Sequence, residues 1–179
     1  MLDIRTKVEG TAPLKKEKVV ILLHGVTGSC EDPFMQDLSG ACAENGCNVI
    51  VFNHFAPNGE KDCRLMDMAH NKHMDEVVLY ARQRFGSEEK PCDIILAGFS
   101  LGGNHILRYL GRAAIDRNQV ELAREVPDQT EFVKAAVAIS MPFCIFTTSM
   151  KLKNTYFGVF DKIIANWLHE AFRHGRFKN

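Results

Sequence analysis

Residues 92–112 read CDIILAGFSLGGNHILRYLGR, and this stretch predicts a strand, a sharp turn and a helix in direct succession. The apolar run at its start has the length and the β-branched content of a buried parallel strand, and apolar side chains then recur at helical spacing. The turn at residues 98–102 is a G-x-S-x-G motif. A strand-to-helix turn of this kind holds its serine in strained geometry and points the hydroxyl out at the carboxyl end of the sheet, where α/β folds bind ligands.

The glycines of this turn have a steric role in that interpretation. Gly98 and Gly102 lack a Cβ where neighbouring elements pass too close for one, and Gly103 follows inside the first turn of the helix. Ser100 is then a candidate nucleophile, and its oxyanion faces the free N–H groups of a helix N-terminus. The structural alternative is a glycine-rich turn with Ser100 as a simple N-cap; the strand before it and the helix after it weigh against that alternative.

A second loop predicts the other half of an oxyanion hole. Residues 18–25 read KVVILLHG, which indicates a buried strand closed by Gly25. In serine hydrolases of this design one donor follows the nucleophile and the other follows an earlier strand, so the backbone N–H groups of Leu101 and Val26 are the candidates. His24 is expected to hydrogen-bond within this loop and shape it; a role as catalytic base is its alternative.

The rest of the chain alternates strands with helices. Apolar patterns predict strands at 2–8, 47–53 and 135–140, and helices from 34 to the Asn45-Gly46 stop, at 69–86 and at 156–172. Such alternation predicts an α/β fold with a mostly parallel sheet and helices on both faces. One partial domain spans residues 1–179, with the sheet core at 18–140 and the start of a block of cap or lid helices at 141–179.

Composition excludes several classes of protein. Of 179 residues, 46% are hydrophobic and 25% charged, which is globular rather than disordered, and the formal charge is 22 − 22 = 0. A basic footprint for nucleic acid is therefore not expected. No run reaches the 18 apolar residues of a membrane span, the N-terminus does not resemble a secretory signal, and the six cysteines form no CxxC pair. We expect reduced thiols and a cytoplasmic protein.

No metal or cofactor is predicted. His70 and His73, flanked by Asp67 and Glu76, could present ligands on one helix face, but an HExxH signature is missing and a solvated polar face is the favoured interpretation. Nucleotide-binding glycine loops are missing as well.

The motifs together resemble the α/β-hydrolase superfamily, and more narrowly the AB-hydrolase family 4 branch of EMB-like esterases and lipases. The resemblance extends over residues 18–179 and is carried by HGVTGS, FNHF, MDEVVLYA, AGFSLGGNHILRYLG and AAVAISMPF. It implies hydrolysis of carboxylic esters, in particular lipid-type acyl esters such as acylglycerols or short- to medium-chain esters, through an acyl-enzyme on Ser100. The family usually has an Arg-Gly pair after the FNH-type strand, where this chain reads His54-Phe55-Ala56-Pro57.

The triad acid and histidine are not found. In this superfamily they follow the serine in the order acid, then histidine. Asp161 and His169 have that order, but on one helix their eight-residue separation puts them ~12 Å apart along the axis, too far for a hydrogen bond. His105 and His174 remain weaker alternatives; a solvated or partly packed position on a helix is favoured for all three histidines. The resemblance therefore implies a fold truncated before its last strands.

Two functions stay open. One is a serine hydrolase whose acid and base lie outside this chain. The other is a degenerate hydrolase that binds an acyl group or a partner without turnover, because a serine without a base is a weak nucleophile. The terminal helix, apolar on one face and basic at its end, is expected to cover the mouth of the active site as a lid, with contact to a membrane interface as the alternative.

Overall fold

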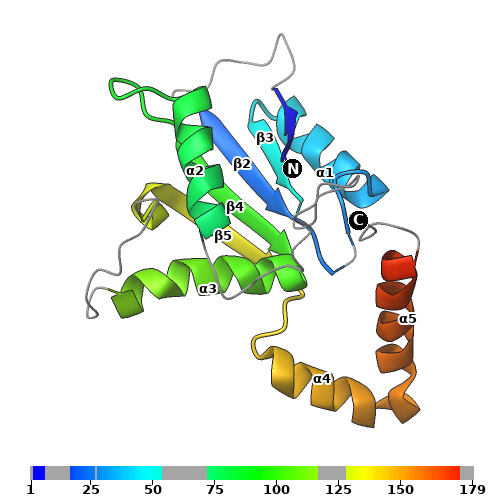
Figure 1. Ribbon diagram of the computed structural model, residues 1–179. Helices are drawn as coiled ribbons and strands as arrows, with labels where there is room; N and C mark the ends of the chain where they lie inside the picture. The colour runs from blue at the N-terminus through cyan, green and yellow to red at the C-terminus, as the bar shows by residue number, and fades with distance from the viewer. Residues whose placement is uncertain (1, 7–16, 27, 54–71, 117–127, 174–179) are drawn as a thin grey trace.

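The computed structural model describes residues 2–6, 17–26, 28–53, 72–116 and 128–173 (Figure 1). Within these ranges five strands form one sheet in the order β1-β3-β2-β4-β5. The strands are β1 (Leu2–Arg5), β2 (Lys18–Leu23), β3 (Asn48–Phe52), β4 (Asp93–Phe99) and β5 (Val133–Ile139). Only the β1–β3 pair is antiparallel, so the predicted mostly parallel sheet is confirmed.

The central strand β2 is packed on both faces. Every residue from Val19 to Leu23 is buried, which explains why this strand is a continuous apolar run rather than an alternating one. Leu23 at its end pairs with Gly98 of β4. The two strands therefore finish at the same level, and the loop after β2 begins beside the turn after β4.

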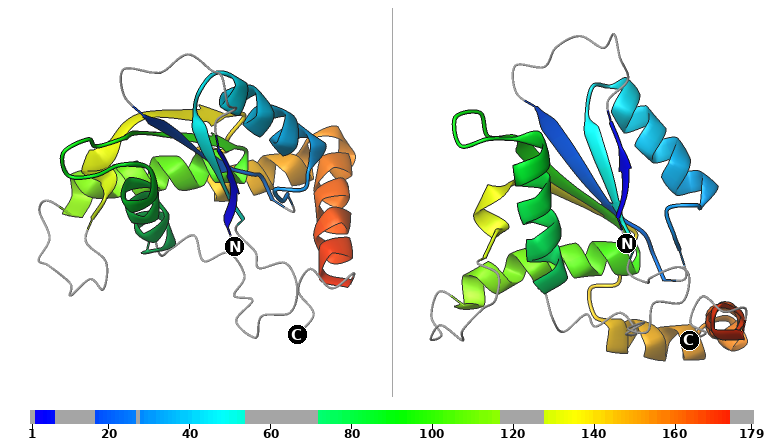
Figure 2. Two further views of the ribbon diagram at one scale, coloured as in Figure 1. Left: turned by 90° about the horizontal axis from the view of Figure 1, so that it is seen from above. Right: turned by 45° about the horizontal axis from the view of Figure 1, so that its top comes forward.

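Helices cover both faces of the sheet, as predicted (Figure 2). On one face, Met74 and Ile106 join a core with β2, β3 and β4. On the other, Met35 packs against β2 and β3. The helices responsible are α2 (Lys72–Phe85) and α3 (Leu101–Asp116) on the first face and α1 (Pro33–Glu44) on the second. α1 stops at the predicted Asn45-Gly46 signal, where Gly46 takes a φ of 80°.

A buried polar cluster joins α2, α3 and the chain before β5. The hydroxyl of Tyr109 donates to an Asp75 carboxylate oxygen at 3.0 Å, and the backbone N–H of Gln129 donates to the same oxygen at 3.1 Å. The Arg82 guanidinium donates to the side-chain oxygen of Gln129 and stacks on the ring of Phe132. Charge-assisted hydrogen bonds of this kind fix the positions of the elements that they join.

The C-terminal region differs from its prediction in two ways. Within the predicted block of helices at 141–179, a helix whose bounds the sequence analysis did not give, α4, covers Ile145–Asn154. The predicted single helix 156–172 is interrupted: a 3-10 turn, η2, covers Tyr156–Gly158, and α5 begins only at Val159 and ends at Arg173. The physical cause of the break is at Phe157, whose φ of 56° lies in the left-handed region and cannot continue a right-handed helix.

Smaller corrections concern element ends. β1 ends at Arg5, earlier than the expected strand to residue 8, and β5 begins at Val133, two residues before its prediction. α3 extends past residue 112 to Asp116. α4 and α5 pack chiefly against each other and lie outside the layers formed by the sheet and α1–α3 (Figure 1).

Candidate active site

Ser100 lies at a sharp turn between β4 and α3. Its φ of 51° is in the left-handed region, which a residue with a side chain adopts only under constraint. Its backbone N–H donates to the carbonyl of Ile139 on β5 at 2.9 Å, and its own carbonyl accepts from the N–H of Asn104 at 3.1 Å, the first hydrogen bond of α3. The predicted strained strand-to-helix turn is confirmed.

The turn closes only because its glycines have no side chains. A Cβ on Gly98 would lie 2.6 Å from the carbonyl oxygen of Gly102, and one on Gly102 would lie 2.5 Å from the carbonyl oxygen of His24. A Cβ on Gly103 would lie 2.9 Å from the Cβ of Met141. These are backbone or near-backbone contacts that cannot move aside, so the predicted steric role of Gly98 and Gly102 is confirmed, and the structure adds the same role for Gly103.

The loop after β2 lies against the serine. A Cβ on Gly25 would be 3.3 Å from the Cβ of Ser100, and the carbonyl of Gly25 accepts from the N–H of Gly28 at 3.2 Å. His24 is buried, and its Nδ1 donates to the same carbonyl at 2.7 Å. Because the acceptor is a carbonyl, this nitrogen carries the proton. The histidine is thus bonded within the loop, as expected.

The two candidate oxyanion donors lie on the two segments that meet here. Leu101 is the first residue of α3, and the first N–H groups of a helix have no acceptor within it. Val26 directly follows Gly25 in the turn against Ser100. Their joint action on one oxygen stays a prediction.

Three polar side chains that the sequence analysis did not single out hold these loops. The Asp32 carboxylate accepts from the N–H of Ser29 at 2.9 Å, and the buried Asn53 accepts from the N–H of Cys30 at 2.8 Å. Asn104, on α3, donates to the carbonyl of Pro142 at 2.7 Å. Asp32 and Asn53 were detectable in principle, as a turn former before a helix and a polar residue closing an apolar strand.

The candidate triad partners do not come together. Asp161 and His169 lie on the one helix α5, so their expected separation is confirmed. His105 is buried on α3, and burial, with the charges of Arg108 and His73, lowers its pKa to about 4. It is therefore neutral near pH 7, beside groups of α2 and α3. His174 lies outside the described residues.

Metal chemistry has no support in the described ranges, where no three His, Cys, Asp or Glu side chains gather. His73 and Glu76 form a solvent-exposed pair at 3.1 Å, whereas Asp67 and His70 lie outside the described residues. No helix in the described part of the chain has the length and apolarity of a membrane span.

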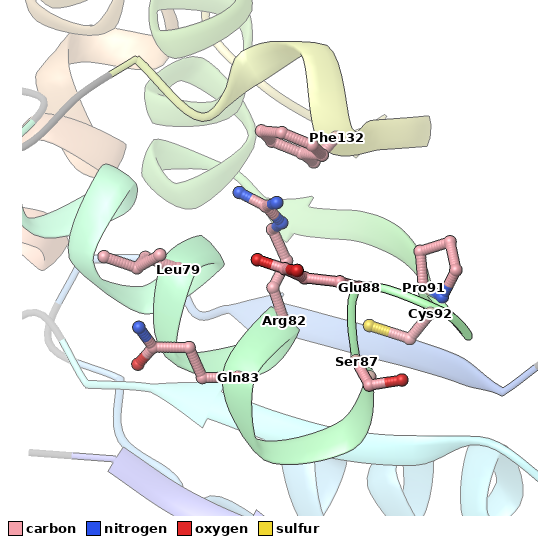
Figure 3. A pocket seen from close by; sticks show the side chains of 9 residues that line it. Leu79, Arg82, Gln83, Ser87, Glu88, Pro91, Cys92 and Phe132 are labelled. Atoms are coloured by element: carbon pink, nitrogen blue, oxygen red, sulfur yellow. The ribbon is translucent and has the colours of Figure 1, made fainter.

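A hollow of about 720 Å³ lies away from the serine (Figure 3). It includes Cys92, just before β4 begins, whereas Ser100 follows the other end of that strand. Arg82 and Phe132, which stack on each other, also line it. The pocket is therefore at the amino ends of the strands and is not part of the site around Ser100.

Comparisons with known proteins agree with this geometry. A family with the alpha/beta hydrolase fold matches residues 18–171. The embryogenesis-associated protein EMB8 of Picea glauca is 26% identical over 162 residues, 86% of this chain and 31% of that protein. The esterase Pf2001 of Pyrococcus furiosus superposes with a TM-score of 0.59 at 20% identity, covering 92% of this chain and 56% of that chain. A soluble variant of Saccharomyces cerevisiae monoglyceride lipase, in complex with a substrate analog, gives 0.55 at 14% identity, covering 93% and 48%.

The matched region contains the four parallel strands and the site at their carboxyl ends. The chain spans about a third of the length of its curated relative and about half of the two solved structures. At these identities the structural likeness concerns the fold. The family match, by contrast, covers most of the chain and includes both the β2 loop and the serine turn. The chain belongs to the alpha/beta hydrolase fold family.

Proposed function

We propose that this chain carries the nucleophile half of a serine hydrolase that acts on carboxylic esters, with lipid-type acyl esters as its substrate class. The observation that supports this most strongly is the constrained Ser100 at the start of α3, with the Gly25 loop packed against it. A strained residue held by several neighbours at a ligand-binding edge of a sheet points to function, because the strain serves no packing purpose.

The proposed chemistry is acyl transfer. The Ser100 hydroxyl attacks the ester carbonyl, loses its proton to a base, and forms a tetrahedral oxyanion facing the N–H groups of Leu101 and Val26. The intermediate collapses to an acyl-serine as the alcohol leaves with a proton, and water then releases the acid and restores the serine. None of the residues that are given a role here supplies the base or the acid of the triad.

Apolar side chains around the turn favour an acyl substrate. Phe99, directly before the serine, packs edge-to-face on Phe34 of α1 with ring centroids 4.5 Å apart. Phe143, in the segment after β5, is 87% exposed. Apolar side chains on the segments next to the serine in the fold suit a hydrocarbon chain better than a charged or sugar-like group.

A fluorophosphonate probe tests the proposal, since it labels serines that act as nucleophiles. We expect labelling of the full-length gene product, which would include the base and the acid, loss of labelling in Ser100→Ala, and normal labelling in the matched control Ser149→Ala on α4. Hydrolysis of a series of acyl esters then measures chain-length preference. No labelling, or labelling that Ser100→Ala leaves intact, would overturn the proposal.

The second candidate is an acyl-binding module without turnover. It is favoured by one observation: Asp161 and His169, which have the right order along the chain, lie on one helix and cannot pair. It predicts saturable binding of a fatty acid with no release of product. Ester hydrolysis that disappears in Ser100→Ala would exclude it.

A further inference from the structure

The η2 turn and α5 carry an outward-facing row of large apolar side chains, here called the α5 stripe. It consists of Tyr156, Phe157, Phe160, Ile163 and Trp167, all exposed. The rings of Tyr156 and Phe160 are 5.8 Å apart in an edge-to-face arrangement, so the turn and the helix form one continuous surface. Contiguous exposed apolar surface of this kind marks an interaction site.

The stripe is separate from the face that packs α5 internally. Asp161, Ile164 and Leu168 follow one another at three- and four-residue spacing and are the less exposed side chains of the helix. The stripe residues Phe160, Ile163 and Trp167 have the same spacing on a neighbouring side. α5 therefore has a less exposed face, which includes Ile164 and Leu168, and a separate apolar face that is exposed.

Phe157 has two unfavourable features, an exposed aromatic side chain and a strained backbone. It is 99% exposed, and its φ of 56° places a bulky residue in the left-handed region. Tyr156 beside it also has a positive φ, 49°. The left-handed backbone at these two residues therefore turns both aromatic rings toward solvent and does not bury them within this chain.

Charge identifies the kind of partner. Residues 141–179 contain six Lys or Arg and two Asp or Glu, a net charge of 6 − 2 = +4, whereas residues 1–140 have 16 − 20 = −4. Lys151, Lys153 and Lys162 are exposed on α4 and α5. Exposed aromatic side chains on a segment with a net positive charge suit an anionic lipid surface, where Trp and Tyr lie at headgroup depth and basic side chains meet the phosphates.

We propose that η2 and α5 dock on the surface of an anionic lipid bilayer, with the α5 stripe at the boundary between headgroups and acyl chains. A helix suits this place because its backbone hydrogen bonds are internal. The exposed apolar surface on β5 is not suited to the bilayer surface, because the edge of a sheet has backbone N–H and C=O groups that need hydrogen-bond partners. The docking does not depend on hydrolysis by Ser100.

The fluorescence of Trp167 can report on binding to lipid vesicles. Trp167 is the single tryptophan of the chain and lies within the stripe. With vesicles of phosphatidylcholine containing phosphatidylserine, we expect a blue shift of its fluorescence and co-sedimentation of the protein, both reduced by added salt. With vesicles of phosphatidylcholine alone, we expect binding at least about tenfold weaker, because basic residues close to an anionic surface each contribute to affinity.

Matched variants locate the contact. Phe157→Ser and Phe160→Ser are each expected to weaken binding about tenfold, since an aromatic side chain then no longer enters the interface. Lys162→Glu weakens binding to anionic vesicles only. Leu107→Ser on α3 and Lys90→Glu before β4 alter exposed residues elsewhere and leave binding unchanged.

Several results would overturn the proposal. They are a Trp167 spectrum that vesicles do not change, stripe variants that bind as well as the unaltered chain, and a dimer that the stripe variants convert to monomer without any vesicle binding. In the last case the stripe binds a second copy instead. Ser100→Ala is expected to bind vesicles normally, so failure of the hydrolase proposal and failure of docking give different results.

Discussion

At the scale of single residues, Ser100 is held from three sides. Its N–H is bonded to β5, its carbonyl starts α3, and the glycine after β2 leaves room for its Cβ. No single contact imposes the left-handed φ; the three together do, because relaxing one would break another. A left-handed non-glycine residue costs about 1–3 kcal/mol, which the surrounding packing offsets.

His105 carries a pH-dependent part of the stability. Its pKa falls from 6.5 to about 4 in the folded chain, mainly through burial. As pH falls below 6.5, the unfolded chain binds a proton on this imidazole and the folded chain does not. The free energy of unfolding is therefore expected to decrease between pH 6.5 and 4, by up to about 3 kcal/mol at the lower end, and to be independent of this group above pH 7.

Urea unfolding at a series of pH values measures this effect. His105→Phe removes the titrating group, so its free energy of unfolding should lose that part of the slope between pH 6.5 and 4, whatever its stability at pH 7. His169→Gln, on the exposed surface of α5, is the control and keeps the slope. An equal slope in His105→Phe and in the unaltered chain would contradict the prediction.

The sequence predicted the serine turn well because its determinants are local. Gly98, Ser100 and Gly102 lie within five residues, and a strand and a helix flank them directly. The supports of the site were not predictable in the same way. Asn104 bonds a carbonyl 38 residues later, and Asn53 bonds an amide 23 residues earlier, so only the fold shows that these amides have partners.

At the scale of elements, the strands and helices of the core were predictable from local sequence, whereas the C-terminal helices were less so. Strands and helices of the core were recognisable because packing on two faces imposes a strong apolar pattern. α4 lacks such a pattern: its residues 147–149 are Thr-Thr-Ser, which have weak helix propensity. Its N-cap is the thiol of Cys144, an uncommon capping group that accepts from the N–H of Thr147.

Asn104 is the link between the serine turn and these helices. Its buried side chain donates to the Pro142 carbonyl at 2.7 Å, just before α4 begins. Asn104→Ala leaves that carbonyl without its donor, at a cost of about 1–3 kcal/mol. We expect faster amide hydrogen exchange in α4, measured against α1, because the anchor between α3 and the start of α4 is lost.

Asn45→Ala is the matched control for this variant. Asn45 also donates from its side chain to a backbone carbonyl, that of Ala41 at 2.8 Å, but the bond is exposed and local. Its loss should cost less than about 1 kcal/mol and leave exchange in α4 unchanged. Equal exchange in α4 for both variants would show that Asn104 does not anchor that helix.

At the scale of the whole molecule, the sheet is covered unevenly. On the α1 side, β2 and β3 are buried, Ile95 and Ala97 of β4 are half-buried, and Val137 and Ile139 of β5 are exposed. The alternation of β4 between buried and half-buried residues has the same cause, since α2 and α3 cover only its other face. The sequence could not show this gradient, because the apolar run 135–139 is as typical of a buried strand as β2 is.

This uncovered surface predicts self-association of the 179-residue chain. Val137 is 49% exposed beside Ile139, on a strand that no other strand in the described ranges pairs on its outer edge. Exposed apolar edge strands pair with other chains, and an added lysine opposes such pairing because its charge would have to be desolvated. Val137→Lys is expected to shift concentration-dependent oligomers towards monomer in sedimentation velocity, at little cost to folding because the position is half exposed.

Two control variants should leave the distribution of oligomers unchanged. They are Leu107→Lys, an equally large change on exposed α3, and Phe157→Ser on the α5 stripe. A chain that stays monomeric across the accessible concentrations, or that associates equally in all three variants, would contradict the prediction and move the association surface away from β5.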